Sequence, residues 1–558
     1  MTDTGTPRRG SPTMRAVAAV PALFIALLFG WPLVELVRRA ADDGTGLRVS
    51  ELLARTGGWD LLWITLAQAA VSAVLAVLVA APIVWLLATV QLPGSALLRI
   101  IVTVPFVLPT VVVGVAFRAL LTGPLSFLGI DGGWAAIILA HIFLNVAVVV
   151  RVVTAAWQQV DPRTVEASRT LGATASRAFV DVVMPRIVPA IAASAALVFL
   201  FCSTSYGVVV ILGNGTARTL ETEIYQQAVG YFRIPEAVTL SMLQIAVVAC
   251  ALLLARIVGG RSTVSGPMAV GRAHHRRPRG FAWVAVVTIL VWIAVWQLLP
   301  LAALLVRSVR PDGRRWTVDG YRALTDATYG DSAFVAMKYS LTSGLAAMVI
   351  SVIVGSLIAL SVTRGGGWPA QIAALIAVLP LGVSAVTLGF GYLLVVSKLP
   401  AELAQSPLVI PAVQALLAIP VVAGIMIPAL NQVPPRLRDA ARTLGAGPLR
   451  VIVSVDFRLT IRSLCAAAGF AFVMAIGEFG ATRFLASADT TTLPVLIGSL
   501  MGRPGQDNLA TAMAASVLLV AASATIIALI ELLGGGATQT RTASPPAAPK
   551  LTSEKAED

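Results

Sequence analysis

Long apolar runs separated by short polar segments make up most of the chain. Twelve of these runs reach about 20 residues, the length that a helix needs to cross the hydrocarbon core of a bilayer. Two runs contain prolines, Pro105 and Pro109 in one and Pro380 in the other, which membrane helices tolerate where neighbouring helices satisfy the freed carbonyls. The pattern predicts an all-α membrane protein with spans at 16–37, 61–90, 98–121, 134–157, 187–212, 238–256, 281–306, 339–361, 370–397, 407–430, 463–483 and 508–530.

The first run follows three arginines, Arg8, Arg9 and Arg15. A secretory signal is the alternative interpretation, but the apolar stretch is too long and no small-residue cleavage site precedes the next basic pair, Arg38 and Arg39. We therefore expect an uncleaved anchor. Because basic residues collect on the cytoplasmic side, the N-terminus is expected inside, and an even number of spans returns the C-terminus to that side.

The composition agrees with a membrane protein. Of 558 residues, 57% are hydrophobic and 12% are charged, compared with about 45–50% and about 25% in soluble domains. These values exclude a soluble enzyme, so the formal charge of +14 calls for a topological explanation rather than a nucleic-acid partner. The three cysteines, Cys202, Cys250 and Cys465, lie in apolar stretches without metal-ligand spacing, so neither a disulfide framework nor a metal site is expected.

Internal similarity divides the chain into two copies. The segment Arg169-Thr170-Leu171-Gly172-Ala173 recurs 273 residues later, and Gln159-Val160, Gly207 and Thr219-Leu220 with Ile224 recur at the same spacing. A constant spacing indicates two parallel six-helix units related by an axis along the membrane normal. The expected organisation is a cytoplasmic tail (1–15), a first repeat (16–256), a basic cytoplasmic linker (257–280), a second repeat (281–533) and a disordered cytoplasmic tail (534–558).

The segment between the fourth and fifth spans of each repeat is predicted to be helical and to face the cytoplasm. In the first repeat Asp161 can cap a helix that has Pro162 at its first position, and Gly172 can end it. A second helix then leads back to the membrane through Met184-Pro185. A helix lying on the lipid surface is one interpretation. Because the loop is duplicated, a docking surface for a cytosolic partner fits better.

This loop resembles the signature of the permease subunits of ATP-binding-cassette importers. The signature is Glu-Ala-Ala, three residues, Gly, nine residues, Ile, any residue and Leu-Pro. The first repeat supplies Glu166-Ala167-Ser168, Gly172, Val182 and Met184-Pro185 at that spacing. The second supplies Asp439-Ala440-Ala441, Gly445 and Val455, and then departs with Phe457-Arg458 in place of Leu-Pro. The resemblance covers nearly the whole chain in two fused copies, and it implies the fold of the type I importers.

The resemblance also implies a mechanism and partners. In this family each loop forms a coupling helix in a cleft of a separate ATPase subunit, oriented in part by the acidic residue. ATP-driven closure of two ATPases rocks the transmembrane halves between inward- and outward-open states, and an extracytoplasmic binding protein delivers the substrate. This chain has no GxxxxGK[ST] phosphate loop. We therefore expect no catalytic activity and no cofactor in this chain, ATP on the two partner ATPases, and no nucleic acid.

Polar residues inside the spans are the candidates for the translocation pathway, because charge within a bilayer is costly. Glu478 is the one acidic residue placed deep within a span, and the equivalent stretch of the first repeat contains Ser205 and Tyr206. A carboxylate and an aromatic ring on opposite sides of a pseudo-twofold pore would suit a cation. A structural pairing of Glu478 with Arg483 is the alternative. A second polar pair, His141 and Asn145, is expected to make interhelical hydrogen bonds rather than to bind a metal.

A finer resemblance concerns the substrate. Segments 212–226 and 477–494 resemble the two-domain permeases of thiamine and iron(III) importers, with the thiamine permeases the nearer of the two. Substrate delivery is expected at external loops 38–60, 213–237, 307–338 and 484–507. The alternative function is a secondary carrier of six plus six helices, driven by an ion gradient. Such a carrier would not need two glycine-terminated helical loops.

Once the topology is assigned, the excess positive charge falls on the predicted cytoplasmic side. The linker 256–280 carries six arginines and no acid, and the second coupling loop carries six arginines against two aspartates. This distribution is the orientation signal of a membrane protein. It also indicates the side on which the ATPases should dock.

Overall fold

The computed structural model describes residues 12–41, 49–92, 94–259, 277–278, 280, 282–325, 332–365, 367–487 and 489–535. Within these ranges the regular structure is helical, as the apolar pattern predicts. Most of the predicted linker and most of both predicted tails lie outside the described residues.

Each repeat places its helices in the same order. The first repeat contains α1 (Pro12–Ile25), α2 (Trp31–Ala41), α3 (Val49–Thr56), α4 (Gly58–Thr89), α5 (Ser95–Val107), α6 (Thr110–Leu121), α7 (Gly133–Gln158), α8 (Pro162–Thr170), α9 (Ala175–Ala178), α10 (Met184–Ser203), α11 (Gly207–Leu212), α12 (Leu220–Tyr225) and α13 (Ile234–Gly259). The second contains α14 (Ala282–Ser308), α15 (Asp319–Arg322), α16 (Ala333–Arg364), α17 (Gly367–Val378), α18 (Ala385–Val396), α19 (Ala401–Ala404), α20 (Val409–Asn431), α21 (Pro435–Thr443), α22 (Pro448–Val451), α23 (Arg458–Ile476), α24 (Thr482–Leu485), α25 (Leu493–Met501) and α26 (Gln506–Gly535).

The number of spans agrees with the prediction, but the third span of each repeat is bent. Ten helical segments of the described chain are long and apolar enough to cross a membrane, and two helix pairs are bent, α5 with α6 by 102° and α17 with α18 by 95°. Counting each pair as one span gives twelve. Pro109 immediately precedes α6, and Pro380 lies in the turn of 3₁₀-helix between α17 and α18. Proline lacks the amide hydrogen that would continue the helix, so each of the two bent spans turns at its proline.

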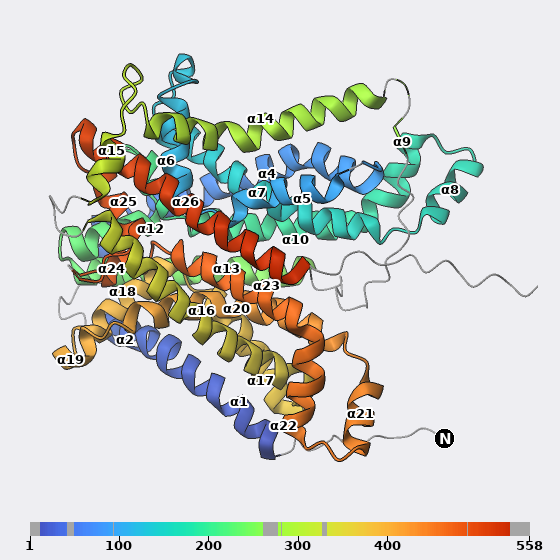
Figure 1. The fold of residues 1–558 in the computed structure, drawn as a ribbon. Coiled ribbons are helices and arrows are strands. Elements are labelled where there is room, and N and C mark those ends of the chain that lie inside the picture. Colours follow the sequence, from blue (N-terminus) through green and yellow to red (C-terminus); the bar gives the residue numbers. More distant parts are fainter. Residues whose placement is uncertain are drawn as a thin grey trace, which may run out of the picture.

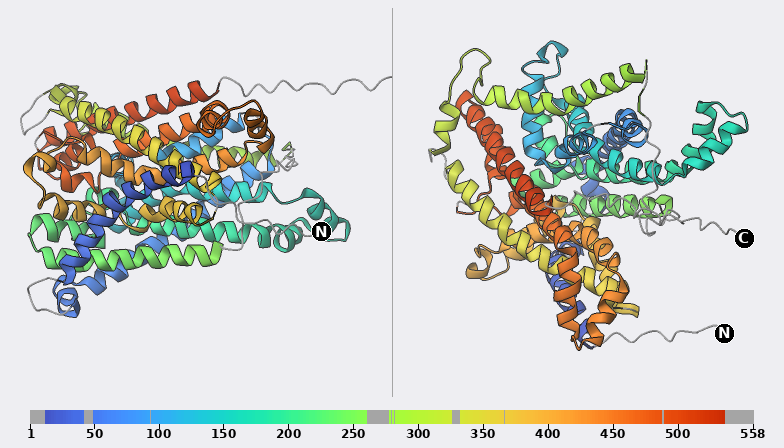
Figure 2. Two further views of the ribbon diagram at one scale, coloured as in Figure 1. Left: turned by 90° about the horizontal axis from the view of Figure 1, so that it is seen from below. Right: turned by 45° about the vertical axis from the view of Figure 1, so that its right-hand side comes forward.

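The first helix of each repeat packs against the other repeat (Figures 1 and 2). Helices α1 and α2 lie against α16, α17 and α18, while α14 lies against α4, α5 and α6. Polar contacts hold the ends of these helices against the other repeat. Glu35 on α2 forms an ion pair with Lys398, and the guanidinium of Arg307 on α14 donates to the carbonyl oxygen of Thr122 at 3.1 Å. The repeats are therefore interlocked, although the duplication in the sequence divides them cleanly.

The fifth spans end before the predicted 187–212 and 463–483 do, and they also begin earlier, at Ala175 and Pro448. Helix α10 ends at Ser203 and α23 ends at Ile476, and a break of a few residues then precedes the short helices α11 and α24. The reason is visible at two equivalent glycines. A Cβ on Gly207 would lie 2.5 Å from Thr110 Oγ1 at the start of α6, and one on Gly480 would lie 3.2 Å from Ala385 Cβ at the start of α18. Each break brings backbone against the bend of the third span.

One hydrogen bond recurs in both repeats and joins the short helices α12 and α25 to the second spans. The amide of Leu220 donates to Thr65 Oγ1 at 3.0 Å, and the amide of Leu493 donates to Ser340 Oγ at 2.7 Å. These amides open α12 and α25, whose first backbone donors have no partner within their own helix. The duplication therefore extends from the sequence to individual hydrogen bonds.

Candidate functional site

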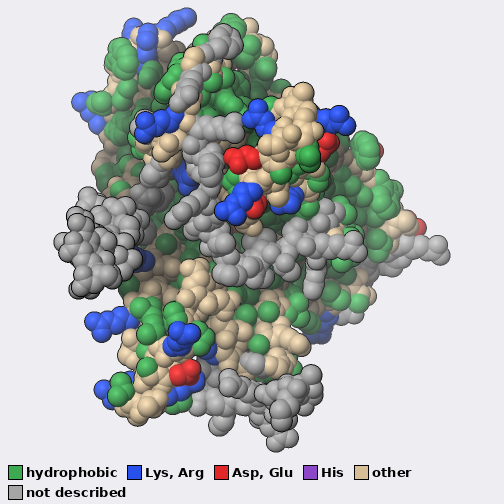
Figure 3. All heavy atoms as spheres, turned by 90° about the vertical axis from the view of Figure 1, so that its right-hand side faces the viewer, with side chains coloured by type: hydrophobic (Ala, Val, Ile, Leu, Met, Phe, Trp, Pro, Cys, Tyr) green, Lys and Arg blue, Asp and Glu red, His purple; other side chains and the backbone are tan. Residues whose placement is uncertain are grey.

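The predicted coupling segments of both repeats lie at one end of the bundle (Figure 1). Helices α8, α9, α21 and α22 lie at this end, and α12, α15, α19 and α25 lie at the opposite end. Figure 3 looks onto the first end, where Lys and Arg side chains gather on two separate protrusions. The described ends of the N-terminal helix α1 and of α26 lie at the same end.

The first coupling segment has the local structure that its sequence predicts. The Asp161 carboxylate accepts a hydrogen bond from the amide of Arg163 at 2.9 Å, with Pro162 at the first helical position. Gly172 ends the helix at φ +92°, a left-handed conformation that glycine adopts without steric cost. In the second segment Gly445 takes the same role at φ +82°.

The turns that end α8 and α21 have the same pattern of backbone hydrogen bonds. The amide of Gly172 donates to the carbonyl of Arg169 at 3.0 Å, and that of Gly445 to the carbonyl of Arg442 at 2.9 Å. The following residue also donates back across the turn in both, Ala173 to Ser168 and Ala446 to Ala441. This is the Schellman arrangement, which satisfies the last carbonyls of a helix.

These turns display one leucine each at the tip of the loop. Leu171 and Leu444 occupy equivalent positions, and each is 89% exposed. The signature residues Glu166, Ala167, Asp439 and Ala440 are also exposed, whereas Ser168 and Ala441 are half-buried. Arg442 forms an exposed ion pair with Asp439 at 3.3 Å. Both loops therefore present the same exposed apolar side chain at the tip, beside exposed charges.

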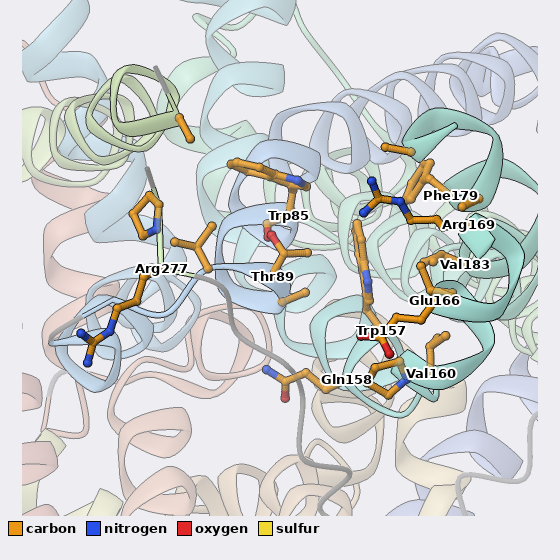
Figure 4. A pocket seen from close by; sticks show the side chains of 18 of the residues that line it. Trp85, Thr89, Trp157, Gln158, Val160, Glu166, Arg169, Phe179, Val183 and Arg277 are labelled. Carbon is orange, nitrogen blue, oxygen red and sulfur yellow. The ribbon is translucent and has the colours of Figure 1, made fainter. Parts of the chain in front are cut away.

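The first coupling helix lies over a hollow of about 470 Å³ (Figure 4). Its lining is mostly apolar and aromatic, with the rings of Trp157 and Phe179 5.3 Å apart. The charged side chains at its edge come from α8 and from the residues that precede α14. The lining includes Trp85, Thr89, Trp157, Val165, Glu166, Arg169, Phe179, Val183 and Arg277.

The second coupling helix is held instead by a buried cluster of charges. Asp456 is 1% exposed, and its Oδ1 accepts hydrogen bonds from Arg364 and from Arg438, both at 2.8 Å. Arg438, on α21, also donates to the carbonyl of Leu430 at 3.0 Å. Arg438 and Asp456 occupy the positions of Val165 and Val183 in the first repeat. We call Arg364, Arg438 and Asp456 the charge triad.

Tyr206, one of the predicted pathway residues, contacts the other repeat at the opposite end of the bundle. Tyr206 and Phe479 are equivalent residues of the two repeats, and their rings stack with centroids 5.2 Å apart and planes 24° apart. They are 6% and 3% exposed. Tyr225 packs on Tyr206 at 5.7 Å and on Phe484 at 5.1 Å, which extends the contact into an aromatic cluster. Aromatic rings therefore fill the contact between the repeats at this level.

Glu478 does not lie within a helix, contrary to its predicted place deep in a span. It lies in the break between α23 and α24, where its carboxylate oxygens accept hydrogen bonds from the amides of Ala481 at 2.7 Å and Thr482 at 2.8 Å. The alternative, a pairing of Glu478 with Arg483, is also absent from the described contacts of Glu478. That guanidinium lies 5.7 Å from the centroid of the Tyr225 ring. Ser205, the equivalent of Glu478, is buried in the matching break.

The other polar pair behaves as expected. His141 Nδ1 lies 3.4 Å from Ser72 Oγ on α4, and the Asn145 amide donates to Cys202 Sγ on α10 at 3.5 Å. Among the described residues, no group of three or more His, Cys, Asp or Glu side chains could hold a metal ion.

Sequence reasoning missed two features of this site. The charge triad depends on three segments that meet only in the folded chain. The second is Glu221, a fully buried carboxylate on α12. Its position in an external loop concealed it, since α12 folds back into the bundle. The only signal available was an acidic residue within the duplicated Thr219-Leu220 segment.

The chain can now be compared with known proteins. The family described as "Binding-protein-dependent transport system inner membrane component" matches residues 90–261 and 351–534. The thiamine transport system permease protein ThiP of Brucella abortus (strain 2308) is 27% identical over 527 residues, which cover 89% of this chain and 93% of that protein. ThiP of Escherichia coli (strain K12) is 25% identical over 523 residues, covering 90% and 92%.

A shorter relative matches part of the chain. The sulfate transport system permease protein CysT of Escherichia coli (strain K12) is 28% identical over 226 residues, which cover 38% of this chain and 80% of that protein. The double family match confirms the two predicted permease repeats and the multi-pass membrane fold. The chain belongs to the family of binding-protein-dependent transport system inner membrane components.

Proposed function

We propose that this chain is the membrane permease of an ATP-driven importer, with separate ATPase subunits docked on its two coupling loops. The observation that carries the proposal is the pair of equivalent loops at one end of the bundle, each ending in a glycine turn that exposes Leu171 or Leu444. Two matching surfaces suit two copies of one partner. This end is then cytoplasmic, together with both termini, in agreement with the arginine-rich linker and loop.

The coupling segments are built to transmit movement. Helices α9 and α10 run together through five residues of π-helix, Phe179–Val183, and α22 and α23 run together through Ile452–Phe457 in the same way. A π-bulge inside a long helix frequently marks a functional site. Each coupling loop therefore continues directly into a fifth span, and the far end of each fifth span carries Tyr206 or Phe479.

Opening of the pathway follows from this connection. Movement of the two coupling loops relative to each other shifts α10 and α23, and these helices carry the two halves of the aromatic contact. Separation of Tyr206 from Phe479 opens the route between the repeats at the external end, where an extracytoplasmic binding protein delivers substrate. Glu478 stabilises the backbone conformation of the break before α24, because its carboxylate accepts two hydrogen bonds from backbone amides.

We further propose thiamine as the substrate. Its support is the match to thiamine permeases over about nine-tenths of both chains, at 25–27% identity. The test is uptake of labelled thiamine in a strain whose copy of this gene is deleted, with and without the gene restored. Uptake that returns only with the gene supports thiamine. Restored uptake of ferric iron, with thiamine uptake unchanged, would contradict it.

A further inference from the structure

Glu221 stands apart from the other acidic residues of the described chain. It lies on α12, between the repeats, and its side chain is 0% exposed. Neither carboxylate oxygen has a hydrogen-bond partner. Removing a carboxylate from water without a partner is among the costliest arrangements in a protein, and in a membrane protein it usually has a functional reason.

The surroundings of Glu221 are polar but carry no counter-charge that pairs with it. The side chains of Ser384 and Gln244 approach the carboxyl group, but neither makes a hydrogen bond of ordinary geometry to it. Ser384 belongs to the second repeat, where it caps α18. The oxygen of the Gln244 amide is also without a partner. The Glu221 carboxyl group and the Gln244 amide oxygen therefore have unused hydrogen-bonding capacity, whereas the Ser384 hydroxyl donates to Thr387 Oγ1 at 2.9 Å.

The aromatic cluster adjoins this carboxylate. Tyr206 interacts electrostatically with Glu221, Tyr225 and Arg483. Arg483 is engaged elsewhere, over the ring of Tyr225 and toward the carbonyl of Val495 at 3.5 Å. A carboxylate next to the faces of aromatic rings is the combination that recognises organic cations, because ring faces carry partial negative charge.

The site has no symmetrical counterpart in the other repeat. Pro494 occupies the position equivalent to Glu221. Glu478 is the acid that the sequence predicts for the pathway, but both of its carboxylate oxygens accept hydrogen bonds from backbone amides. Glu221 is therefore the acid near the aromatic contact that has capacity to receive a substrate.

We propose that Glu221 is the substrate carboxylate of the pathway, which receives the positively charged ring of an aromatic cation when Tyr206 and Phe479 separate. The proposal deepens the proposed function and rests on it: the thiazolium ring of thiamine carries a permanent positive charge. Gln244 and Ser384 complete the polar side of the site, and Tyr206 and Tyr225 supply ring faces. In the closed state the carboxylate is sealed away from both solutions.

The test compares two substitutions on the same short helix. Glu221→Gln removes the charge and keeps the shape. Glu223→Gln is the matched control, because Glu223 is also buried but is satisfied by Arg218 at 3.3 Å and Gln227 at 2.7 Å. Both variants are placed in the whole importer in proteoliposomes, with the same binding protein. Uptake is measured for thiamine and for its neutral isostere, in which carbon replaces the positively charged ring nitrogen.

We expect Glu221→Gln to lower thiamine uptake by about tenfold to a hundredfold, as for loss of one charge-assisted contact. The preference for thiamine over the neutral isostere should fall as well, while ATP hydrolysis stimulated by the binding protein persists. Glu223→Gln should match the wild type. If the preference for thiamine over the neutral isostere is unchanged in Glu221→Gln, or if uptake of both solutes falls equally, the proposal for Glu221 is overturned. The proposed importer function would still stand. A wild-type importer that takes up no thiamine would contradict the proposed substrate itself.

Discussion

The two coupling loops have the same outer surface, but the residues that support them from beneath, here called their foundations, are different. Outside, α8 and α21 begin at a proline, end in the same glycine turn and expose equivalent leucines. Beneath them, α8 lies over an apolar hollow lined by aromatic rings, and α21 is held by the charge triad. Under the proposed function, the shared outer surface serves partner docking, and the features that differ only hold the loops in place. The following predictions test that division, from the largest expected effect to the smallest.

Loss of both glycine turns should have the largest effect. Valine at Gly172 and Gly445 would force a β-branched residue into a left-handed conformation at an estimated cost of about 1–2 kcal/mol each. The turn would rearrange and displace the exposed leucines. We expect ATP-driven uptake to be abolished while membrane insertion is unaffected, as measured by uptake in vesicles and by protein level in the membrane fraction. Normal uptake by the double variant would contradict the coupling role.

Breaking the charge triad should destabilise the second repeat alone. Asp456→Val leaves two arginines without their buried partner, at an expected cost of about 3–5 kcal/mol. Thermal unfolding in detergent measures the change. Thr89 ends α4 where Arg364 ends α16, so the triple variant Arg364→Thr, Arg438→Val and Asp456→Val gives the second repeat the residues of the first. This variant should recover most of the loss. A triple variant no more stable than Asp456→Val would show that the two foundations are not interchangeable.

Removing the aromatic foundation of the first loop should cost less. Trp157 is only half-buried and borders the hollow, so Trp157→Ala should destabilise the protein by about 1–2 kcal/mol, below the range for fully buried tryptophan. The loss should appear in thermal unfolding and as a lower affinity for the ATPase. An effect on unfolding as large as that of Asp456→Val would contradict the ranking of the two foundations.

Substituting the exposed leucines should leave stability unchanged and affect only docking. Leu171→Ala and Leu444→Ala each remove an 89% exposed side chain, so unfolding should shift by less than about 0.5 kcal/mol. Affinity for the purified ATPase should fall by about fivefold to tenfold for each, the loss of a modest interface contact. The two variants should behave alike despite their different foundations. Unequal losses would mean that the outer surfaces are not equivalent in use.

The sequence was sufficient for features that depend on local chemistry. Apolar length predicts the spans, constant spacing predicts the duplication, and Asp161, Pro162 and Gly172 predict the ends of α8. It failed where distant segments meet. The bends near Pro109 and Pro380 meet the breaks near Gly207 and Gly480, and backbone from different spans packs together there. No periodicity records such packing.

The acid of the pathway illustrates the same limit. Glu478 attracted attention because it interrupts an apolar run, yet its oxygens are used by neighbouring backbone amides. Glu221 lies in a segment that reads as an external loop, and burial becomes apparent only when α12 folds against α18 and α4. Whether a carboxylate has oxygens without hydrogen-bond partners depends on the residues that surround it in the folded chain, and hydropathy does not record them.

The most direct test of the central claim is the energy source of transport. The chain is reconstituted in proteoliposomes with its ATPase and binding protein, and solute accumulation is measured with ATP present or absent and with ion gradients imposed or collapsed. We predict accumulation that requires ATP, the ATPase and the binding protein, and that continues without any ion gradient. Accumulation driven by an ion gradient in vesicles that lack the ATPase would contradict the account and identify a secondary carrier.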